Sequence, residues 1–555
     1  MNKDSLRFFL IAAIGAAVVY FAFIRKPDHS NVPPRRVESA PSAENRLPER
    51  TFQVLTPLSG ARAGLDVKVT TRSGAVRAIR LNGAQFTMPA AVPDPGASRA
   101  EGDRRFQLAS TDREESLPLR LKLNVRRGDT AVTPEFIDFE GRQVSEREVE
   151  LTWRGNDVEV VRSIRGEKPF ALRVTTTVTN HGAPVTVEHQ LPLYHWVTRD
   201  EEAGGFFRQS WQLSEGICRH GNELYREARD KLLERAPDAV LPGPSRFVAI
   251  GNLYFTTALV PRAGGDANCR LYAEDRPSAD NPTGSIYTGA LAWGRSELAT
   301  GASRTFAATA YFGPKETSTL QAADPALVDT VNLGFFAFIA RILMRVLRFF
   351  HGIVGNWGVA IILLTVCVRI ALLPLLVRSM KSLAAMQKLK PEIDEINKRL
   401  GDNQEAKSLA MMELYRKHEV NPLSGCLPQV AQLPIWWALY TTLQTSVELF
   451  HAPFMLWWRD LSAPDPFYVL PLVLGALIFL QQKLMPPQGM DPMQAKMMTY
   501  FMPIFLTVIS LFLPAGLALY MLVNSVLGIL QQWYTKVQMD RHSASAIVVR
   551  PVTGG

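Results

Sequence analysis

Hydrophobic and polar residues alternate over a long first part of the chain, between about residues 50 and 325. Apolar residues at every second position are typical of half-buried strands, and turn residues such as Ser73-Gly74 and His181-Gly182 lie between such stretches. The repeated spacing predicts an all-β sandwich over 50–325, interrupted by a helical pattern at 221–236. The clearest windows of alternation are 65–81, 149–164, 172–193, 247–261 and 303–314.

Long apolar runs replace this alternation after residue 331. Five of them are long enough to suggest membrane-spanning helices, and they are followed by a polar tail at 535–555. The segment 331–356 differs, because Arg341, Arg345 and Arg348 recur on one face of its helical pattern; this favours an amphipathic helix in the membrane interface. The predicted spans are 357–377 and, within 428–534, the runs 428–450, 467–483, 497–513 and 516–533.

One further apolar run, Phe8–Ile24, lies near the start of the chain within residues 1–26. It is flanked by basic residues, and a membrane anchor and a cleaved signal peptide both fit its length. The bulky, then charged residues that follow it lack a small-x-small cleavage site, which favours the anchor. Residues 27–49 are rich in Pro, Ser and charged residues without any period, and they form a predicted linker.

The distribution of basic residues orients the predicted spans. The segment 378–427 is rich in Lys and Arg, whereas 451–466 contains only Arg459, so the positive-inside rule places 378–427 in the cytoplasm. Counting back through the spans places the β-domain outside and both termini inside; in a Gram-negative cell the β-domain is then periplasmic. The basic residues of this loop are Arg378, Lys381, Lys388, Lys390, Lys398, Arg399, Lys407, Arg416 and Lys417.

The cytoplasmic segment 378–427 has the pattern of a helical hairpin. Apolar residues recur at threes and fours on both sides of Gly401, for example Ile393 and Ile396 before it and Leu409 and Met412 after it. The two stripes predict a short antiparallel coiled coil. Acidic residues nearly balance the basic ones in this hairpin, which argues against a dedicated nucleic-acid surface.

Motifs for catalysis, metals and cofactors do not occur in this sequence. There is no CxxC pair, nucleophile elbow, HExxH or phosphate loop, so we expect neither an enzyme nor a metal or cofactor site. The β-domain is therefore interpreted as an accessory or interaction domain, with a cleft for peptide or sugar as the open alternative. Cys218 and Cys269 could form a disulfide in an oxidising compartment or stay as two buried thiols.

Arg369 is the least expected residue of the predicted spans. It lies nine residues before Arg378, hence about 13 Å deeper in the membrane at 1.5 Å per residue, which is too deep for its side chain to reach the interface. No Asp or Glu lies inside any predicted span, and Glu448, at the outer end of the next span, is the nearest acid. These facts favour a hydrated cationic site over a structural ion pair.

Polar residues at helical spacing support such a site. Thr365 precedes Arg369 by one turn, while Gln429 and Gln432 on the next span, and Tyr520 and Asn524 on the last, lie on shared helix faces. A polar cavity open to the cytoplasm would let the polar tail of a polypeptide cross without full exposure to hydrocarbon. A solute transporter with a cationic intramembrane site is the alternative, although no internal repeat and no intramembrane acid support it.

Four stretches carry a resemblance to a known family. The chain resembles the YidC/Oxa/Alb family of membrane protein insertases, in its bacterial YidC form, over essentially residues 1–540. The anchor, the large β-domain and the loop hairpin occur in the same order. The four stretches are "NPLSGCLPQVAQLPIWWALY" (421–440), "SVELFHAPFMLWWRDLSAPDPFYVLP" (446–471), "DPMQAKMMTYFMPIF" (491–505) and "LPAGLALYMLVNSVLGILQQ" (513–532).

The resemblance implies a specific arrangement and activity. The anchor and the five later spans make six predicted transmembrane helices, and the resemblance implies that five of them form an insertase core around a hydrophilic groove that contains one arginine, here Arg369. Thr365 and Tyr520 match groove positions that resemble substrate-contacting ones. The third and fifth spans would form an apolar slide, and the β-domain would be a super-sandwich. The family acts on nascent membrane proteins in the bilayer of the bacterial inner membrane, alone or with the Sec translocon, and receives ribosome-bound chains. The short tail here suggests that ribosome contact uses the cytoplasmic loops.

Overall fold

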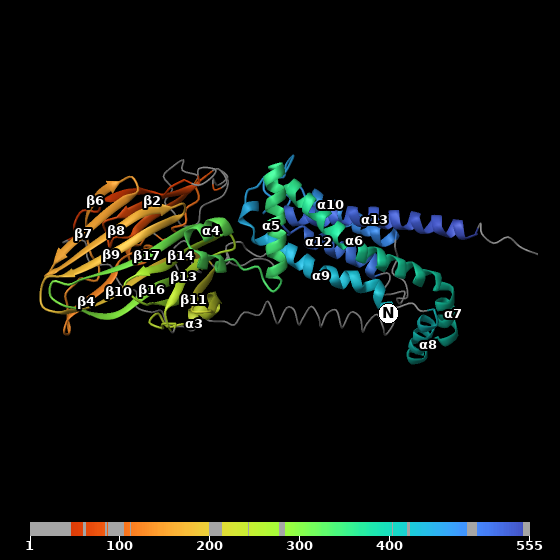
Figure 1. Cartoon of the computed structure of the whole chain (residues 1–555), viewed down its shortest axis with the longest axis horizontal. Coiled ribbons are helices and arrows are strands. Elements are labelled where there is room, and N and C mark those ends of the chain that lie inside the picture. The colour runs from red at the N-terminus through yellow and green to blue at the C-terminus, as the bar shows by residue number, and fades with distance from the viewer. Residues whose placement is uncertain are drawn as a thin grey trace, which may run out of the picture. The chain divides into compact units, whose positions relative to one another are not determined.

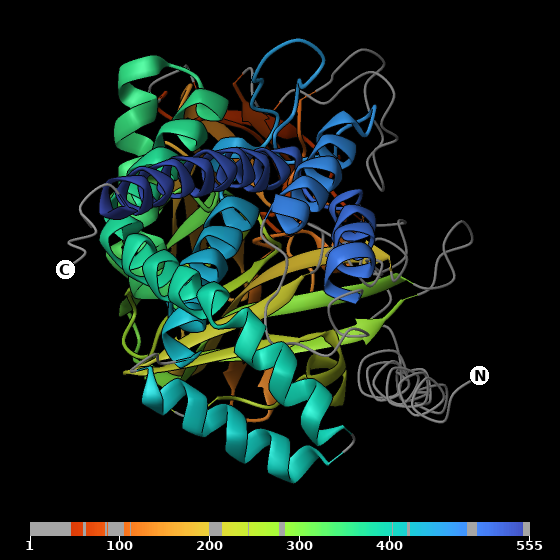
Figure 2. The ribbon, with the colours of Figure 1, turned by 90° about the vertical axis from the view of Figure 1, so that its right-hand side faces the viewer.

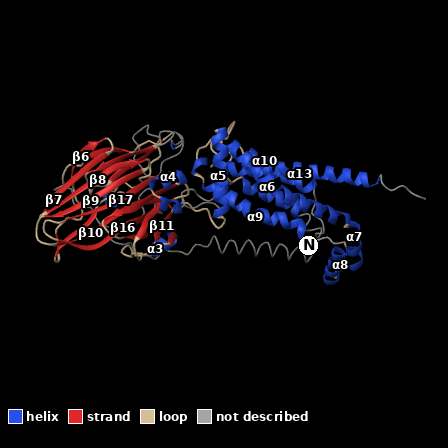
Figure 3. Ribbon diagram, in the orientation of Figure 1, coloured by secondary structure: helices blue, strands red, loops and turns tan. Residues whose placement is uncertain are grey.

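The computed structural model describes residues 46–547 except 59–62, 84–85, 87–104, 112, 199–213, 242, 277–283, 402, 419–421 and 485–496. Within the helices, the structure describes the backbone alone at 376, 378–388, 390, 394, 397, 404, 408, 422–431, 535–536 and 538–547. The predicted anchor 1–26, most of the linker 27–49 and the end of the tail therefore lie outside the described residues. Strands occupy the chain between Thr51 and Pro314, and long helices follow (Figure 3).

Three antiparallel sheets build the β-domain (Figure 1). The largest has the strand order β12-β11-β13-β14-β17-β9-β8-β7-β6, the second β15-β16-β10-β4-β5 and the smallest β1-β2-β3, and β13 of the first sheet packs on β16 of the second. The strands are β1 (Thr51–Leu55), β2 (Gly64–Thr70), β3 (Val76–Asn82), β4 (Lys122–Arg127), β5 (Thr130–Ala131), β6 (Glu140–Ser145), β7 (Glu148–Gly155), β8 (Val158–Lys168), β9 (Ala171–Asn180), β10 (Val185–Thr198), β11 (Glu215–His220), β12 (Glu223–Ala228), β13 (Ser245–Gly251), β14 (Phe255–Ala263), β15 (Ala267–Asp275), β16 (Gly284–Leu298) and β17 (Ser303–Pro314).

The hairpins predicted around short turns are confirmed in two cases and wrong in a third. β2 pairs with β3, and β7 pairs with β8 through a turn in which Asn156 and Asp157 both have positive φ, as a tight two-residue hairpin turn requires. β9 and β10 flank His181-Gly182 but belong to different sheets, so that turn carries the chain from one layer to the other. The helical pattern at 221–236 is also only partly right, because β12 occupies its first half and the short helix α3 (Arg229–Glu234) its second.

The sandwich core contains buried polar groups among its aliphatic and aromatic side chains. Arg162 is fully buried, and its guanidinium donates to the carbonyl of Leu119 and to the hydroxyl of Thr176, 3.0 Å away. His189 stacks on Trp293 with ring centroids 5.1 Å apart. Burial, together with the charge of Arg162, lowers the pKa of His189 to about 3. The folded domain therefore holds this histidine neutral.

This buried histidine predicts that the β-domain loses stability in mild acid. The folded pKa of His189 is below the unfolded value of 6.5, so the unfolded chain binds more protons as the pH falls from about 6.5 towards 3. At pH 5 the expected loss is about 2 kcal/mol of unfolding free energy from this residue. Thermal unfolding of the full chain, followed by the circular dichroism of its β structure between pH 7 and pH 5, measures it.

A non-titrating variant provides the comparison for this pH effect. His189→Phe should make the unfolding midpoint less dependent on pH, whereas the same change at the exposed His181 should not. Some dependence should remain, because burial also lowers the pKa of His195 to about 4. An unchanged slope in His189→Phe would show that the buried imidazole is not the cause.

Cys218 and Cys269 both lie in the β-domain core. They are buried and free, and their thiols interact with each other. Burial raises the pKa of the Cys269 thiol well above its usual value. Of the two alternatives left open by the sequence, the structure therefore has the two buried thiols.

Helices make up the rest of the described chain (Figure 1). α6 packs against α5, α9 and α13, and α10 packs against α12 and α13; the view in Figure 2 looks on these helices, coloured green to dark blue, from another side. They are α4 (Thr317–Ala323), α5 (Ala337–Val354), α6 (Trp357–Lys388), α7 (Lys390–Leu400), α8 (Gln404–Lys417), α9 (Pro422–Thr445), α10 (Val469–Leu484), α12 (Met502–Ser510) and α13 (Ala515–Ile547). The shorter helical turns among them are η4 (Pro325–Thr330), η5 (Val447–Leu449) and η6 (Met497–Phe501), whereas η3 (Glu114–Ser116) belongs to the β-domain.

Five of these helices coincide in position with the five spans predicted after residue 356. By length and composition, two helical segments among the described residues can cross a membrane, Trp357–Leu375 in α6 and Ala515–Tyr534 in α13. Val469–Leu484 and Met497–Ser510 are shorter apolar helices. α6 and α13 also continue beyond the predicted ends at 377 and 533, because the apolar run ends there but helix-forming polar residues follow.

The predicted amphipathic helix corresponds to α5. Its buried face consists of Ala340, Leu343 and Leu347, while Arg341 and Arg345 are exposed. Arg348 instead pairs with Glu448, with 2.6 Å between guanidinium nitrogen and carboxylate oxygen. The acid that the sequence places nearest to Arg369 is thus bound by a different arginine.

The hairpin after α6 contains an apolar contact, as predicted. Of the stripe predicted on its second helix, Leu409, Met412 and Tyr415, only Tyr415 takes part in it. Leu389 and Ile393 pack against Leu414, with Met411 and Tyr415 beside them. Leu409 and Met412, which the periodicity had placed in the contact, are exposed. A spacing of threes and fours fits two adjacent faces of α8, and the sequence pattern did not distinguish them.

Candidate functional site

Arg369 extends from α6 to α13, near the middle of the apolar part of both helices. Its Nε donates to Oδ1 of Asn524 at 2.8 Å, and its Nη2 donates to the backbone carbonyl of Asn524 at 2.7 Å. A longer contact of 3.5 Å joins Nη1 to Oε1 of Gln531, two turns further along α13. Two neutral amides and one backbone carbonyl therefore hold the guanidinium.

No carboxylate among the described residues forms an ion pair with Arg369. Its positive charge is not neutralised by these partners, because amide and carbonyl oxygens are dipoles. A half-buried guanidinium that keeps its full charge attracts anionic groups more strongly than one in bulk water does. The interpretation of Arg369 as a cationic site rather than half of an ion pair is consistent with this geometry.

Gly528 lies beside the guanidinium of Arg369, and its missing side chain leaves room for that group. A Cβ at this position would lie 3.1 Å from Nη2 of Arg369 and 3.2 Å from Nε2 of Gln481 on α10. Almost any side chain at 528 would therefore press on both polar groups. Sequence reasoning did not include Gln481 in the site, although the pair Gln481-Gln482 at the end of an otherwise apolar run was a usable signal.

The other residues predicted for the site differ in how close they lie to Arg369 and in which groups they contact. Tyr520 is buried on α13, where its hydroxyl interacts with Gln432 of α9 and lies near the charge of Arg369. Thr365 is buried one turn before Arg369, and its hydroxyl donates to the carbonyl of Ile361 in its own helix at 2.7 Å. The side chain of Gln429 lies outside the described residues.

The structure thus brings together four of the six predicted residues, Arg369, Asn524, Tyr520 and Gln432, on the facing sides of α6, α9 and α13. The hydroxyl of Thr365 instead donates its hydrogen bond to a carbonyl of its own helix, a common arrangement for threonine inside an apolar helix.

A metal site is not evident in the described part of the chain. No group of three His, Cys, Asp or Glu side chains comes together there.

Apolar side chains cover the outer faces of two helices. Leu433 and Trp437 are exposed on α9, one turn apart. The segment formed by η6 and α12 exposes a longer row, Tyr500, Phe501, Ile504, Phe505 and Val508. Exposed apolar surface of this extent is typical of helices that face lipid or another apolar segment.

Comparisons with known proteins decide the family. A model of the "60Kd inner membrane protein" family matches residues 349–542, and a model of the "YidC periplasmic domain" matches residues 96–346. The membrane protein insertase YidC of Anaeromyxobacter dehalogenans (strain 2CP-C) is 36% identical over 508 residues, which cover 87% of this chain and 85% of that relative. The chain belongs to the YidC family of membrane protein insertases.

A second relative and a solved structure are also similar to this chain. The YidC insertase of Magnetococcus marinus (strain MC-1) is 50% identical over 230 residues, 41% of each chain. A crystal structure of an active YidC insertase with its first transmembrane domain resolved is 19% identical, covers 95% of this chain and 98% of its own, and has a TM-score of 0.37. As a YidC family member the chain is an inner-membrane protein, and its β-domain is the periplasmic domain of the family.

Proposed function

We propose that this chain inserts nascent proteins into the bacterial inner membrane through a hydrophilic groove between α6, α9 and α13. The observation that carries the proposal is the guanidinium of Arg369, held by the side chain and carbonyl of Asn524 without a carboxylate among the described residues. A cation in this state can bind the acidic, translocated tail of a substrate for a short time and release it. Tyr520 and Gln432 supply further polar contacts, and Thr365 and Gln429 belong to the proposed groove.

The apolar part of a substrate takes a different route in this proposal. The exposed rows on α9 and on η6 with α12 form a slide along which a hydrophobic segment moves into lipid. Separate paths suit the substrate's chemistry, because its polar tail needs hydrogen-bond partners while its apolar helix needs none beyond its own backbone.

The topology that accompanies this function has six transmembrane helices. The anchor 1–26 and the linker 27–49 precede the periplasmic β-domain 50–325; the interfacial helix 331–356 and the span 357–377 follow it. The hairpin 378–427 lies in the cytoplasm, 428–534 contains the last four spans, and the tail 535–555 is cytoplasmic, as is the N-terminus. Ribosomes bind at the cytoplasmic loops, and the Sec translocon assists with some substrates.

Depletion and rescue in a Gram-negative bacterium tests the proposed function. Cells depleted of their own YidC should regain growth and insertion of a small inner-membrane protein when this chain is expressed, and protease protection of the substrate's tail reports insertion. A chain that reaches the membrane folded but restores no substrate's insertion would contradict the proposal. Restored solute uptake without insertion would favour the transporter alternative.

A further inference from the structure

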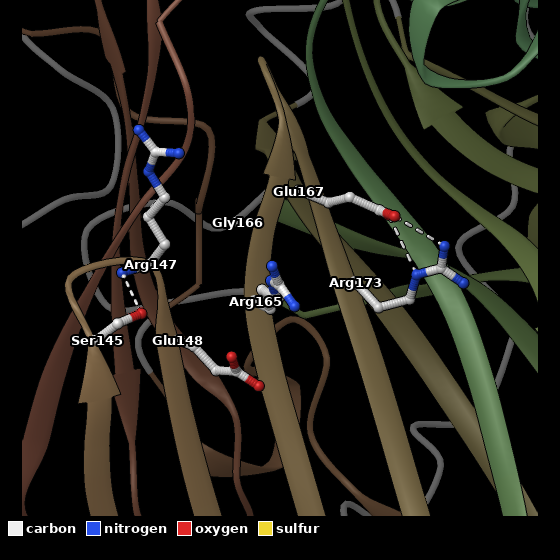
Figure 4. Close-up of a pocket in the computed structure, with 7 residues that line it drawn as sticks. All are labelled: Ser145, Arg147, Glu148, Arg165, Gly166, Glu167 and Arg173. Atoms are coloured by element: carbon white, nitrogen blue, oxygen red, sulfur yellow. Dashed lines mark hydrogen bonds and ion pairs between the residues drawn. The ribbon is translucent and has the colours of Figure 1, made fainter.

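A pocket of about 530 Å³ lies on the outer face of the nine-stranded sheet (Figure 4). The turn between β6 and β7, the end of β8 and the start of β9 form it. Three arginines and two glutamates dominate its lining. The lining residues are Ser145, Arg147, Glu148, Arg165, Gly166, Glu167 and Arg173.

Strand register places two of these arginines directly opposite each other. Arg165 of β8 is the Cα partner of Arg173 on β9 and of Glu148 on β7. Like charges on directly opposite residues of neighbouring strands are unfavourable. Figure 4 shows the guanidinium of Arg173 turned toward Glu167 and away from Arg165, so the two charged groups avoid each other. The row Glu148-Arg165-Arg173 still carries one excess positive charge.

The glutamates do not neutralise all of this charge. Glu167 accepts two hydrogen bonds from Arg173, at 3.0 and 3.1 Å, and that guanidinium holds the pKa of Glu167 below its usual range. Glu148 accepts a hydrogen bond from Ser163 at 2.9 Å. With the described residues, neither Arg147 nor Arg165 forms an ion pair, and Figure 4 shows no dashed line reaching either guanidinium.

The backbone beneath these arginines is closely packed. The amide of Gly166 donates to the carbonyl of Arg147 at 2.7 Å, and a Cβ on Gly166 would overlap the backbone carbonyl of Leu55. The floor of the pocket is therefore fixed by main chain, while the long side chains of Arg147 and Arg165 can move above it. Such an arrangement suits bidentate binding of an oxyanion by arginine.

The pocket lies at the end of the sheet from which the chain leaves the β-domain. Arg173 is the Cα partner of Thr309 on β17, and β17 ends five residues later at Pro314, before α4, η4 and α5. Lys168, just after the pocket residues of β8, donates to the carbonyl of Ala322 in α4 at 2.7 Å. The pocket therefore lies at the same edge of the β-domain as the segment that leads into the amphipathic helix α5.

We propose that this pocket binds a phosphate group through Arg147 and Arg165. A phospholipid headgroup and a free phosphate ester both present this chemistry. Phosphate fits better than a single carboxylate, because its oxygens are arranged tetrahedrally, with three unesterified oxygens in a monoester and two in a phospholipid diester, so that they can accept from two guanidinium groups that approach from different directions. The assignment is independent of the groove around Arg369.

Thermal unfolding of the full chain in nanodiscs of an uncharged glycolipid, which contains no phosphate, tests the site. Added millimolar glycerol phosphate should raise the unfolding midpoint, because a ligand that binds only the folded state stabilises it. In Arg147→Gln/Arg165→Gln the apparent affinity should fall by about tenfold or more, since charge-assisted hydrogen bonds are lost. Arg154→Gln is the matched control: Arg154 lies on β7, on the same outer face but at the other end of the strand, and pairs with Glu159.

Nanodiscs that contain phosphatidylglycerol distinguish the two sources of phosphate. If the ligand is a headgroup, this lipid raises the midpoint of the wild type but not of the double variant, and glycerol phosphate adds nothing further. If the ligand is a free ester, the lipid has no effect and glycerol phosphate still acts. The proposal fails if neither compound shifts the wild type, if the double variant responds as the wild type does, or if only an acidic peptide such as polyglutamate gives an arginine-dependent shift. Circular dichroism confirms that the variants are folded.

Discussion

Replacing Arg369 by alanine should lower the insertion of substrates with acidic translocated tails by about tenfold or more, while the protein stays folded and in the membrane. The estimate follows from the value of a hydrogen bond to a charged group, about 1.5–3 kcal/mol, of which 1.4 kcal/mol is a factor of ten. Folding should survive because the partners of Arg369, Asn524 and Gln531, are neutral, so its removal leaves no buried charge behind. Depletion and rescue with a protease-protection readout measures the effect.

Suitable substrates and control variants show whether a loss of insertion comes from the missing charge of Arg369 or from a damaged fold. Substrates whose tails are neutral or basic should depend on Arg369 much less than acidic ones do. Arg345→Ala, which removes an exposed arginine from α5, should leave the insertion of acidic tails unchanged. Full activity with Ala, Glu or Leu at position 369 would rule out a role for the cation.

Replacing Gly475 by leucine should separate α10 from α12 and deplete the folded protein. A Cβ at this buried glycine would already overlap the hydroxyl oxygen of Thr507, and that hydroxyl is fixed by donating to the carbonyl of Pro503 at 2.7 Å. Forced overpacking of this kind costs about 1–3 kcal/mol, and the larger leucine should reach the upper end of that range. The midpoint of thermal aggregation in detergent and the amount of protein in the membrane both report the loss.

Two further variants test whether the close contact is the cause. Ala476→Leu adds the same bulk one residue away, on the exposed side of α10, and should be tolerated. Thr507→Gly should partly rescue Gly475→Leu, because it removes the atoms that the new side chain meets. Equal damage from the changes at 475 and 476, or no rescue by the second change, would contradict this view of the α10–α12 contact.

Local patterns predicted the elements of the β-domain well, but not all of their partners. The alternation of polar and apolar residues predicted the positions of β7 and β8. Their pairing was also predictable, because only the tight turn at Asn156-Asp157 separates them. β9 and β10 have an equally clear pattern, but β9 pairs with β17 besides its neighbour β8, and β10 pairs with β16. These partners, β17 and β16, lie 86 to 140 residues away in the chain. Such long-range partners depend on how two sheets pack, which a single stretch of sequence does not contain.

The candidate site was predictable in part for a similar reason. The depth of Arg369 and the absence of intramembrane acids follow from the order of residues, and they indicated a cation without a carboxylate partner. Which residue hydrogen-bonds to Arg369 depends on how α13 is rotated about its axis relative to α6, and this rotation places Asn524 there. Whether Gln481 lies near the site depends in the same way on how α10 packs. On α8, likewise, periodicity indicated an apolar face but placed Leu409 in the contact instead of Leu414.

Site-specific photo-crosslinking of a stalled nascent chain tests the central claim, that tail and apolar helix take separate paths. With the probe in the acidic tail of the substrate, we expect crosslinks to α13 around Asn524 and to α6 beside Arg369. With the probe in the apolar segment, we expect crosslinks to α9 at Leu433 or Trp437 and to α12 at Ile504 or Val508. Crosslinks from both probes to the β-domain alone, or from the tail to lipid without any contact on α6 and α13, would contradict the account.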